Sequence, residues 1–164
     1  MADLVQHRSV RALQRAFREA PAPELVALVG RHEAKFAGWL RLVGPLSMSL
    51  TGMHGWWGKQ FRRRADEEDS LEGENLLLRQ ERILTSIPMT ARIAPSRLDS
   101  RPALQISYPP DARWPHRRVK DELRPLDERT HLGLSFGLPL APRGGAPFLL
   151  YRRETPPTDA GAQP

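Results

Sequence analysis

Short segments that alternate apolar and polar residues fill most of this chain after its first thirty residues. They cover residues 31–36, 39–43, 51–64, 75–79, 83–93, 103–108, 118–124, 131–136 and 147–151. Most are short and bounded by Gly, Pro, Asp or Ser, a pattern typical of β-strands. Because successive side chains point to opposite faces of a strand, each segment offers one face to a core. About eight or more antiparallel strands of this length can close into a barrel around side chains or one small ligand.

The first part of the chain predicts helices instead. Asp3 can cap a helix that runs to about Ala20, with apolar residues at helical spacing on one face and arginines on the other. Pro21 and Pro23 separate it from a short second helix over 24–29. The favoured interpretation packs the apolar face on the core; attachment of this helix to an anionic membrane surface or a partner is the alternative.

The predicted organisation has three parts. Residues 1–22 form an N-terminal amphipathic helix, residues 23–153 form the barrel domain, and residues 154–164 form a disordered tail without an apolar anchor. Pro88 lies inside the longest strand segment, where it requires a bulge or an edge position.

Composition narrows the classes of function. The chain has no cysteine, which excludes disulfides, cysteine nucleophiles and thiolate metal sites. No apolar run reaches the roughly 20 residues that a membrane span needs, and arginines interrupt the first twenty residues, so we expect a cytoplasmic protein without integral membrane association. The net charge of +6 comes from basic residues spread along the chain, 22 of the 25 being arginine, and does not favour nucleic acid as the main partner.

The segment Gly55-Trp-Trp-Gly-Lys-Gln-Phe61 is the first candidate for a binding wall. Strand alternation places Trp57, Lys59 and Phe61 on one face and Trp56, Gly58 and Gln60 on the other. A cation between two aromatic side chains suits the wall of a small-molecule pocket. Glycines in a strand mark a bend, a bulge or a close backbone approach.

Asp121 is the strongest candidate for a residue that binds a polar group or transfers a proton. It shares a strand face with Val119 and Leu123, so it lies among apolar neighbours if that face is interior. A buried carboxylate needs a cation or several donors, and Lys59 is the natural partner. A buried Lys59–Asp121 pair would bind a polar headgroup or support proton transfer, unless the face points outward or the pair is only structural. Three further apolar residues complete the expected pocket lining: Leu123, Met89 and Phe136.

Five dispersed histidines lack the spacing of a zinc site, so no metal is predicted. A haem-binding barrel, in which a single histidine would be the proximal ligand of the iron, is an alternative. The strand histidines that could serve are His32, His54 and His131. A histidine at strand spacing is more often a satisfied polar side chain, and the main prediction includes no cofactor.

Three stretches resemble bacterial GXWXG-type proteins, a lipocalin-like family of unknown function. They are Gly55-Trp-Trp-Gly-Lys-Gln-Phe61, residues 119–134 with their Asp, Arg, Asp and Leu-Gly order, and Pro147-Phe-Leu-Leu-Tyr-Arg152. Where the family has its Gly-x-Trp-x-Gly strand, this chain has Gly30-Arg-His-Glu-Ala34, without the tryptophan and the second glycine. The resemblance implies a lipocalin-like closed barrel and supplies no catalytic residues.

The expected function is binding of a hydrophobic small molecule, a lipid or an aromatic metabolite, inside a mainly β barrel. One alternative is a barrel enzyme that isomerises, dehydrates or cyclises an apolar carbonyl compound, with Asp121 as general acid or base, or Glu122 if the register is reversed. Another is an interaction module that uses the arginines of the first helix. The sequence leaves the oligomeric state open, a homodimer included.

Overall fold

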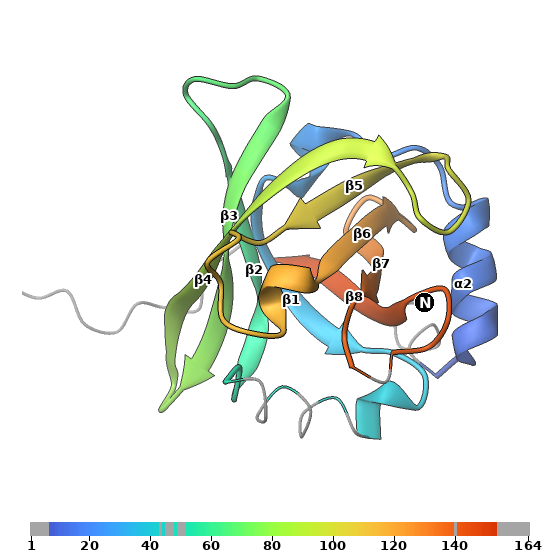
Figure 1. Cartoon of the computed structure of the whole chain (residues 1–164), viewed down its shortest axis with the longest axis horizontal. Coiled ribbons are helices and arrows are strands. Elements are labelled where there is room, and N and C mark those ends of the chain that lie inside the picture. Colours follow the sequence, from blue (N-terminus) through green and yellow to red (C-terminus); the bar gives the residue numbers. More distant parts are fainter. Residues whose placement is uncertain (1–6, 43, 45–47, 49–51, 140, 154–164) are drawn as a thin grey trace, which may run out of the picture.

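Eight antiparallel strands close into a barrel in which each strand pairs with its neighbour in the chain and β8 returns to β1 (Figure 1). The computed structural model describes residues 7–42, 44, 48, 52–139 and 141–153. The strands are β1 Gly30–Phe36, β2 Trp56–Arg63, β3 Ser70–Arg79, β4 Arg82–Pro95, β5 Pro102–Ser107, β6 Lys120–Pro125, β7 Thr130–Phe136 and β8 Ala146–Arg153. The predicted mainly β barrel is thus confirmed. The predicted tail and the Asp3 cap lie outside the described residues.

The helical elements differ from the prediction in extent. Helix α2 spans Val10–Glu19 and begins at Ser9, whose side chain accepts a hydrogen bond from the Ala12 amide, so it is shorter than a helix reaching back to Asp3. The short second helix is the 3-10 turn η1, Leu25–Leu28, and another such turn, η2, covers His116–Arg118. Residues 40–42, predicted as extended, are helical.

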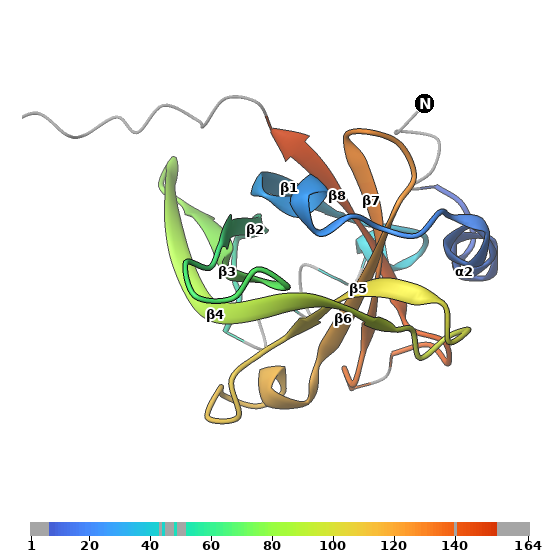
Figure 2. The ribbon, with the colours of Figure 1, turned by 90° about the horizontal axis from the view of Figure 1, so that it is seen from above.

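The barrel has two ends, which we name by a residue at each. The Trp56 end carries the connections 37–55, 80–81, 108–119 and 137–145. The Leu28 end carries η1 and the connections 64–69, 96–101 and 126–129. Helix α2 lies outside the barrel and packs against β7 and β8, as both ribbon views show (Figures 1 and 2).

The buried apolar side chains form two clusters, one inside the barrel and one between the barrel and α2. The inner cluster is built from strand side chains together with Leu28 of η1: Leu28, Phe61, Leu71, Met89, Ala91, Leu104, Ile106, Leu123, Phe148 and Leu150. The outer cluster joins α2 to the opposite face of the sheet: Leu13, Phe17, Ala37, Ala103, Leu132, Leu134 and Leu149. The apolar face of α2 therefore packs against the barrel, which confirms the favoured interpretation of this face.

Glycines let bulky side chains fit inside the barrel. A Cβ on Gly133 would lie 2.3 Å from the Phe148 ring, and one on Gly73 would lie 2.5 Å from the Phe61 ring. On Gly58 it would lie 1.9 Å from the His32 carbonyl oxygen of the neighbouring strand. Gly58 therefore marks a close backbone approach, one of the meanings that the sequence allowed for a glycine in this segment.

Two bulges shift the alternation that the sequence predicts. The β2–β3 register shifts between Trp56 and Gly58, and the β3–β4 register shifts between Glu74 and Asn75, opposite Pro88. The second shift confirms that the proline requires an irregularity. A bulge inserts one extra residue and changes which face the following residues occupy.

Arg124 fastens α2 to the barrel from the outer face of β6. Its fully buried guanidinium donates two 2.7 Å hydrogen bonds to the Asp99 carboxylate. It also donates 2.9 Å to the Phe17 carbonyl oxygen and lies 4.6 Å from the centre of the Phe17 ring. This arginine holds the pKa of Asp99 below its usual range. One planar cation thus joins a strand, a helix and the 96–101 connection.

We expect Arg124→Ala to lower the free energy of unfolding by about 3 kcal/mol, because it removes one partner of a buried ion pair and the donor that bonds the Phe17 carbonyl oxygen of α2. Urea titration followed by circular dichroism measures the loss. Hydrogen exchange should show that residues 10–19 lose protection before the barrel does. Arg97→Ala, an exposed arginine of the same connection, is the control. An equal effect of both substitutions would contradict this role.

Candidate functional site

A buried polar network lies inside the barrel, in the half toward the Trp56 end. The Lys59 ammonium lies 3.0 Å from the Asp121 carboxylate, and the two side chains are 2% and 4% exposed. The structure therefore contains the buried pair that the sequence predicts. Lys59 comes from the first half of β2 and Asp121 from the start of β6, so the pair spans the barrel interior between strands that are not neighbours in the sheet.

Tyr108 bridges the two charges. The Lys59 ammonium donates a 2.6 Å hydrogen bond to the Tyr108 hydroxyl, and this hydroxyl donates a 2.9 Å bond to Asp121. Burial of the phenol, and then the charge of Asp121, raise the pKa of Tyr108 well above its ordinary value. The phenol is therefore protonated at neutral pH and acts as a hydrogen-bond donor.

Asn75 and Ser135 complete the network. The Asn75 side-chain oxygen accepts 3.1 Å bonds from the Lys59 ammonium and from the indole of Trp56. The Ser135 hydroxyl donates 2.6 Å to the second oxygen of Asp121. Each of the three protons of Lys59 thus has an acceptor within the protein, and both oxygens of Asp121 have donors. Such satisfaction is what a buried ion pair requires.

Aromatic side chains surround the ammonium. Lys59 lies 5.6 Å from the ring centre of Trp56 and 5.2 Å from that of Tyr108, within the range of cation–π attraction. Trp56 also contacts Phe36 and Phe148, with ring centres 5.4 and 6.0 Å apart. The predicted aromatic neighbours of the cation are therefore present, but the indole in these contacts is that of Trp56, whereas the sequence predicted Trp57.

The candidate lining residues divide between the two faces of the sheet. Phe61, Met89 and Leu123 belong to the inner cluster, as predicted. Phe136 does not line the interior: it packs with the outer cluster beneath α2, and the prediction for it is wrong. The assignment of Trp56 to the outer face is also wrong, because the bulge turns its indole toward Lys59 and Asn75. Trp57, the extra residue of that bulge, is half-buried.

Glu122, the alternative base, has a structural role outside the barrel interior. Its carboxylate accepts a 2.5 Å bond from the Ser96 hydroxyl and a 2.9 Å bond from the Arg97 amide. It is fully buried and faces opposite to Asp121 along β6. This carboxylate stabilises the 96–101 connection, and of the two acids only Asp121 belongs to the interior network.

Two histidines form a second polar layer nearer the Leu28 end. The rings of His32 and His131 are buried and their centres lie 5.7 Å apart. His32 Nε2 lies 2.9 Å from the Leu28 carbonyl oxygen, whereas neither ring nitrogen of His131 has a hydrogen-bond partner among the described residues. Burial lowers the pKa of each histidine to about 4. The haem alternative stays a prediction; of its candidate residues, His54 is exposed and these two are enclosed.

Sequence reasoning missed Tyr108, Asn75 and Ser135. Tyr108 ends the segment 103–108 that the sequence predicts as a strand and precedes two prolines, and the alternation did not single it out; in the structure it follows the last residue of β5. Ser135 lies on the strand face opposite the apolar residues Leu132 and Leu134, and the sequence analysis did not assign that face to the interior. The strand pairing identifies both residues as neighbours of Asp121. Asp121 pairs with Ser135 on one side and with Ile106, two residues before Tyr108, on the other.

The structure also bears on metals and membranes. Among the described residues, no three His, Asp or Glu side chains lie close enough together to hold a metal ion. None of the described helices is long and apolar enough to cross a bilayer.

Comparison with known proteins supports the fold alone. No protein-family model matches the chain, and no curated protein does so. A solved structure described as the crystal structure of a protein from Thermomonospora curvata superimposes with a TM-score of 0.66 at 16% identity, over 93% of each chain. At that identity the likeness extends to the barrel and not to a function. The resemblance to GXWXG-type proteins stays a prediction.

The histidine layer predicts a pH dependence of stability. The folded-state pKa of about 4 lies below the ordinary 6.5, so the unfolded chain binds more protons between these values. Stability is full above pH 6.5 and falls as the pH drops toward 4, by an amount on the order of 3 kcal/mol for each histidine. Urea unfolding at several pH values measures the slope.

His131→Leu should flatten this slope without lowering stability at pH 7, because the ring nitrogens that it removes have no hydrogen-bond partner among the described residues. The exposed His54 supplies the control variant, His54→Gln, which should retain the slope. If His131→Leu unfolds with the same pH dependence as the parent protein, the histidines are not the cause.

Proposed function

We propose that this protein binds an apolar small molecule with one polar end, a lipid or an aromatic metabolite, in the half of the barrel toward the Trp56 end. The observation that carries the proposal is the Lys59–Asp121 pair, which is enclosed at 3.0 Å inside the barrel together with the inner apolar cluster. Ligand pockets are typically apolar with a few converging polar groups.

Energetics favour a binding role for this pair over a role in stability. Replacing a buried ion pair by apolar residues of similar volume is often neutral or stabilising by about 1–4 kcal/mol. A barrel selected only for stability would have no need of five connected polar side chains in its interior. A polar group that must meet a ligand is a reason to retain them.

The burial of the network members suggests how a ligand meets them. Lys59 and Asp121 are almost completely buried, whereas Trp56, Tyr108 and Ser135 are half-buried. All three protons of Lys59 are already bonded within the protein. We therefore assign the polar end of the ligand to the hydroxyls of Tyr108 and Ser135, with the ion pair behind them fixing their orientation, and the apolar part to Trp56, Met89, Phe148 and other inner side chains.

The double variant Lys59→Met/Asp121→Leu separates the two roles. Lys59→Met alone should destabilise the protein by about 3–5 kcal/mol, because it leaves a buried carboxylate without its cation. The double variant should regain the stability of the parent protein and lose ligand binding. Denaturant titration gives the stability. Binding is measured by displacement of a fluorescent fatty acid and by native mass spectrometry of the purified protein.

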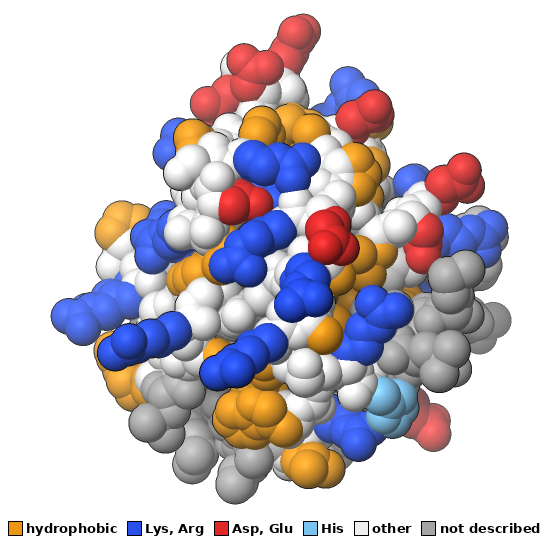
Figure 3. Space-filling view, turned by 90° about the vertical axis from the view of Figure 1, so that its right-hand side faces the viewer, with side chains coloured by type: hydrophobic (Ala, Val, Ile, Leu, Met, Phe, Trp, Pro, Cys, Tyr) orange, Lys and Arg blue, Asp and Glu red, His pale blue; other side chains and the backbone are white. Residues whose placement is uncertain are grey.

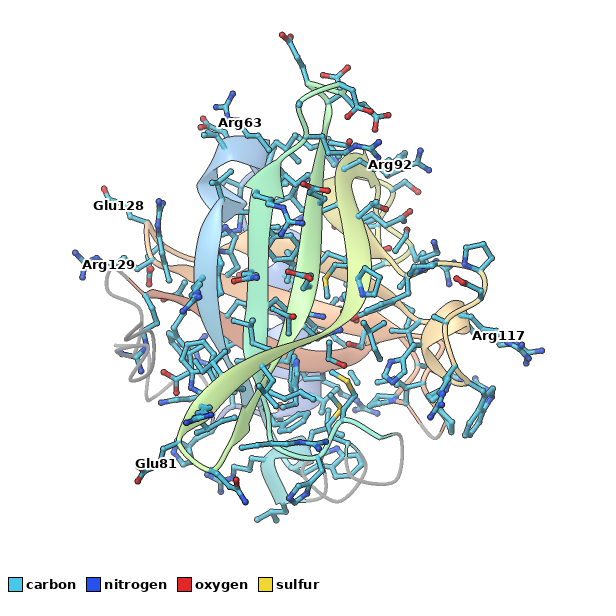
Figure 4. All side chains as sticks on the ribbon, turned by 90° about the vertical axis from the view of Figure 1, so that its left-hand side faces the viewer. Arg63, Glu81, Arg92, Arg117, Glu128 and Arg129 are labelled. Carbon is cyan, nitrogen blue, oxygen red and sulfur yellow. The ribbon has the colours of Figure 1, made fainter. Side chains whose placement is uncertain are left out.

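Tyr108→Phe, which keeps the ring, should weaken binding about tenfold through the loss of one hydrogen bond in an apolar site. Arg92→Gln, on the outside of the barrel (Figure 4), is a matched surface control. A double variant that is stable and binds the probe as tightly as the parent protein does would refute the proposed site.

A second candidate function is supported by the contact between Asp121 and Tyr108. A buried carboxylate 2.9 Å from a protonated phenol provides a base beside a hydrogen-bond donor, the pair of groups that isomerisation, dehydration or cyclisation of an apolar carbonyl compound needs. Asp121→Asn distinguishes the two functions. Binding retained with turnover lost favours the enzyme, whereas a protein that turns over none of these carbonyl compounds remains a binder. The cytoplasmic location stays a prediction.

A further inference from the structure

Most of the large exposed hydrophobic side chains among the described residues lie at one end of the barrel. Trp39 is 52% exposed, Leu42 is 76% exposed and Trp114 is 57% exposed, and all three belong to connections of the Trp56 end. The exposed Leu78 and Leu84 flank the 80–81 turn at the same end. Single exposed apolar residues are ordinary, but a group of them with tryptophans marks an interaction surface.

Arginines without carboxylates surround part of this apolar group. The segments 7–14, 37–55 and 137–145 contain four arginines and no aspartate or glutamate: Arg8, Arg11, Arg41 and Arg143. The connections of the Leu28 end (64–69, 96–101 and 126–129) contain seven carboxylates and four arginines. The charge of this protein is thus polarised along the barrel. Figure 3 shows the α2 side, where most acidic side chains lie in the upper half, whereas basic side chains lie in both halves and stand beside hydrophobic ones in the lower half.

Contacts bring these three segments together. A hollow beside the start of α2 is lined by Arg11, Trp39 and Arg143, together with Val10, Gln14 and Pro142. The Gln14 side chain donates hydrogen bonds to the carbonyl oxygens of Arg143 and Gly145, and Arg41 contacts His7. We call Arg8, Arg11, Trp39, Arg41, Leu42 and Arg143 the Trp39 patch; all six side chains are exposed.

We propose that the Trp39 patch docks this protein on the surface of an anionic phospholipid bilayer. Tryptophan favours the level of the lipid headgroups, where an amphipathic ring is half in water, and Leu42 supplies an apolar contact with the acyl boundary. Arginines attract anionic headgroups, and guanidinium binds phosphate with two parallel hydrogen bonds. The complementary charge of the lipid is the reason to favour a bilayer over an uncharged partner.

Helix α2 does not insert in this arrangement. Its apolar residues Leu13 and Phe17 are fully buried against the barrel, so only its arginine face meets the lipid. Docking is therefore peripheral, and it turns the Trp56 end, which holds the Lys59–Asp121 network, toward the membrane. An apolar ligand would then pass between the bilayer and the barrel without crossing water. This docking goes beyond the proposed binding function and is measured without any ligand.

The experiment compares sedimentation with vesicles of phosphatidylcholine alone and of phosphatidylcholine with about one quarter phosphatidylserine. We expect binding to the anionic vesicles and a decline as salt is raised. Each arginine near such a surface is worth ~1 kcal/mol, which is about fivefold in the partition coefficient. Arg11→Gln with Arg143→Gln should therefore weaken binding about 25-fold.

The matched control is Arg63→Gln with Arg92→Gln, which removes the same charge from exposed residues near the Leu28 end (Figure 4) and should change binding by about twofold or less. A quencher carried on the acyl chains should dim the tryptophan fluorescence, and Trp39→Phe should reduce this effect. Equal loss in both double variants would overturn the proposal. So would tight binding of a single-stranded oligonucleotide with no binding to vesicles. Vesicle binding retained in Lys59→Met/Asp121→Leu separates this proposal from the ligand site.

Discussion

Closure of the sheet by the pairing of β1 with β8 is the constraint on which the rest of this structure depends. Six residues of β1, Arg31 to Phe36, pair with β8, so neither strand is left as an open edge. Closure creates an inside whose width is set by the strand number, and that inside must be filled. Here Phe61 and Phe148 fill it by lying over glycines of neighbouring strands. The remaining space holds polar side chains, and they give the barrel its chemistry.

The polar interior is arranged as two layers with different electrostatics. Near the Leu28 end, His32 and His131 lie side by side and remain neutral because burial disfavours their charged forms. Toward the Trp56 end, Lys59 and Asp121 lie 3.0 Å apart, and hydroxyl groups of Tyr108 and Ser135 bond to the pair. The histidine rings thus stay uncharged near neutral pH, whereas the ion pair orients the dipoles of the neighbouring hydroxyl groups. This difference supports the Trp56 half, rather than the histidine layer, as the place for the polar end of the proposed ligand.

The sequence was sufficient for the barrel and for its central ion pair, and it failed where periodicity alone was used. Lys59 and Asp121 could be paired because each interrupts an apolar strand face. Phe136 was misplaced because its strand is apolar on the outer face, where α2 covers it, and polar on the inner face. A helix that covers the outside of a barrel thus reverses the usual sense of the alternation. Trp56 was misplaced because a bulge cannot be seen in alternation. Both errors come from tertiary context.

The division of charge between the two ends bears on how the proposed ligand site and the Trp39 patch would act together. The chain has its longer connections at the Trp56 end: 37–55, 108–119 and 137–145 contain 19, 12 and 9 residues, whereas the connections of the Leu28 end span six residues or fewer. Long connections can present exposed tryptophans and arginines without disturbing strand pairing. The same segments adjoin Tyr108 and Ser135, the half-buried members of the network. A surface contact made by these connections therefore acts on the side of the barrel where the polar network is most accessible.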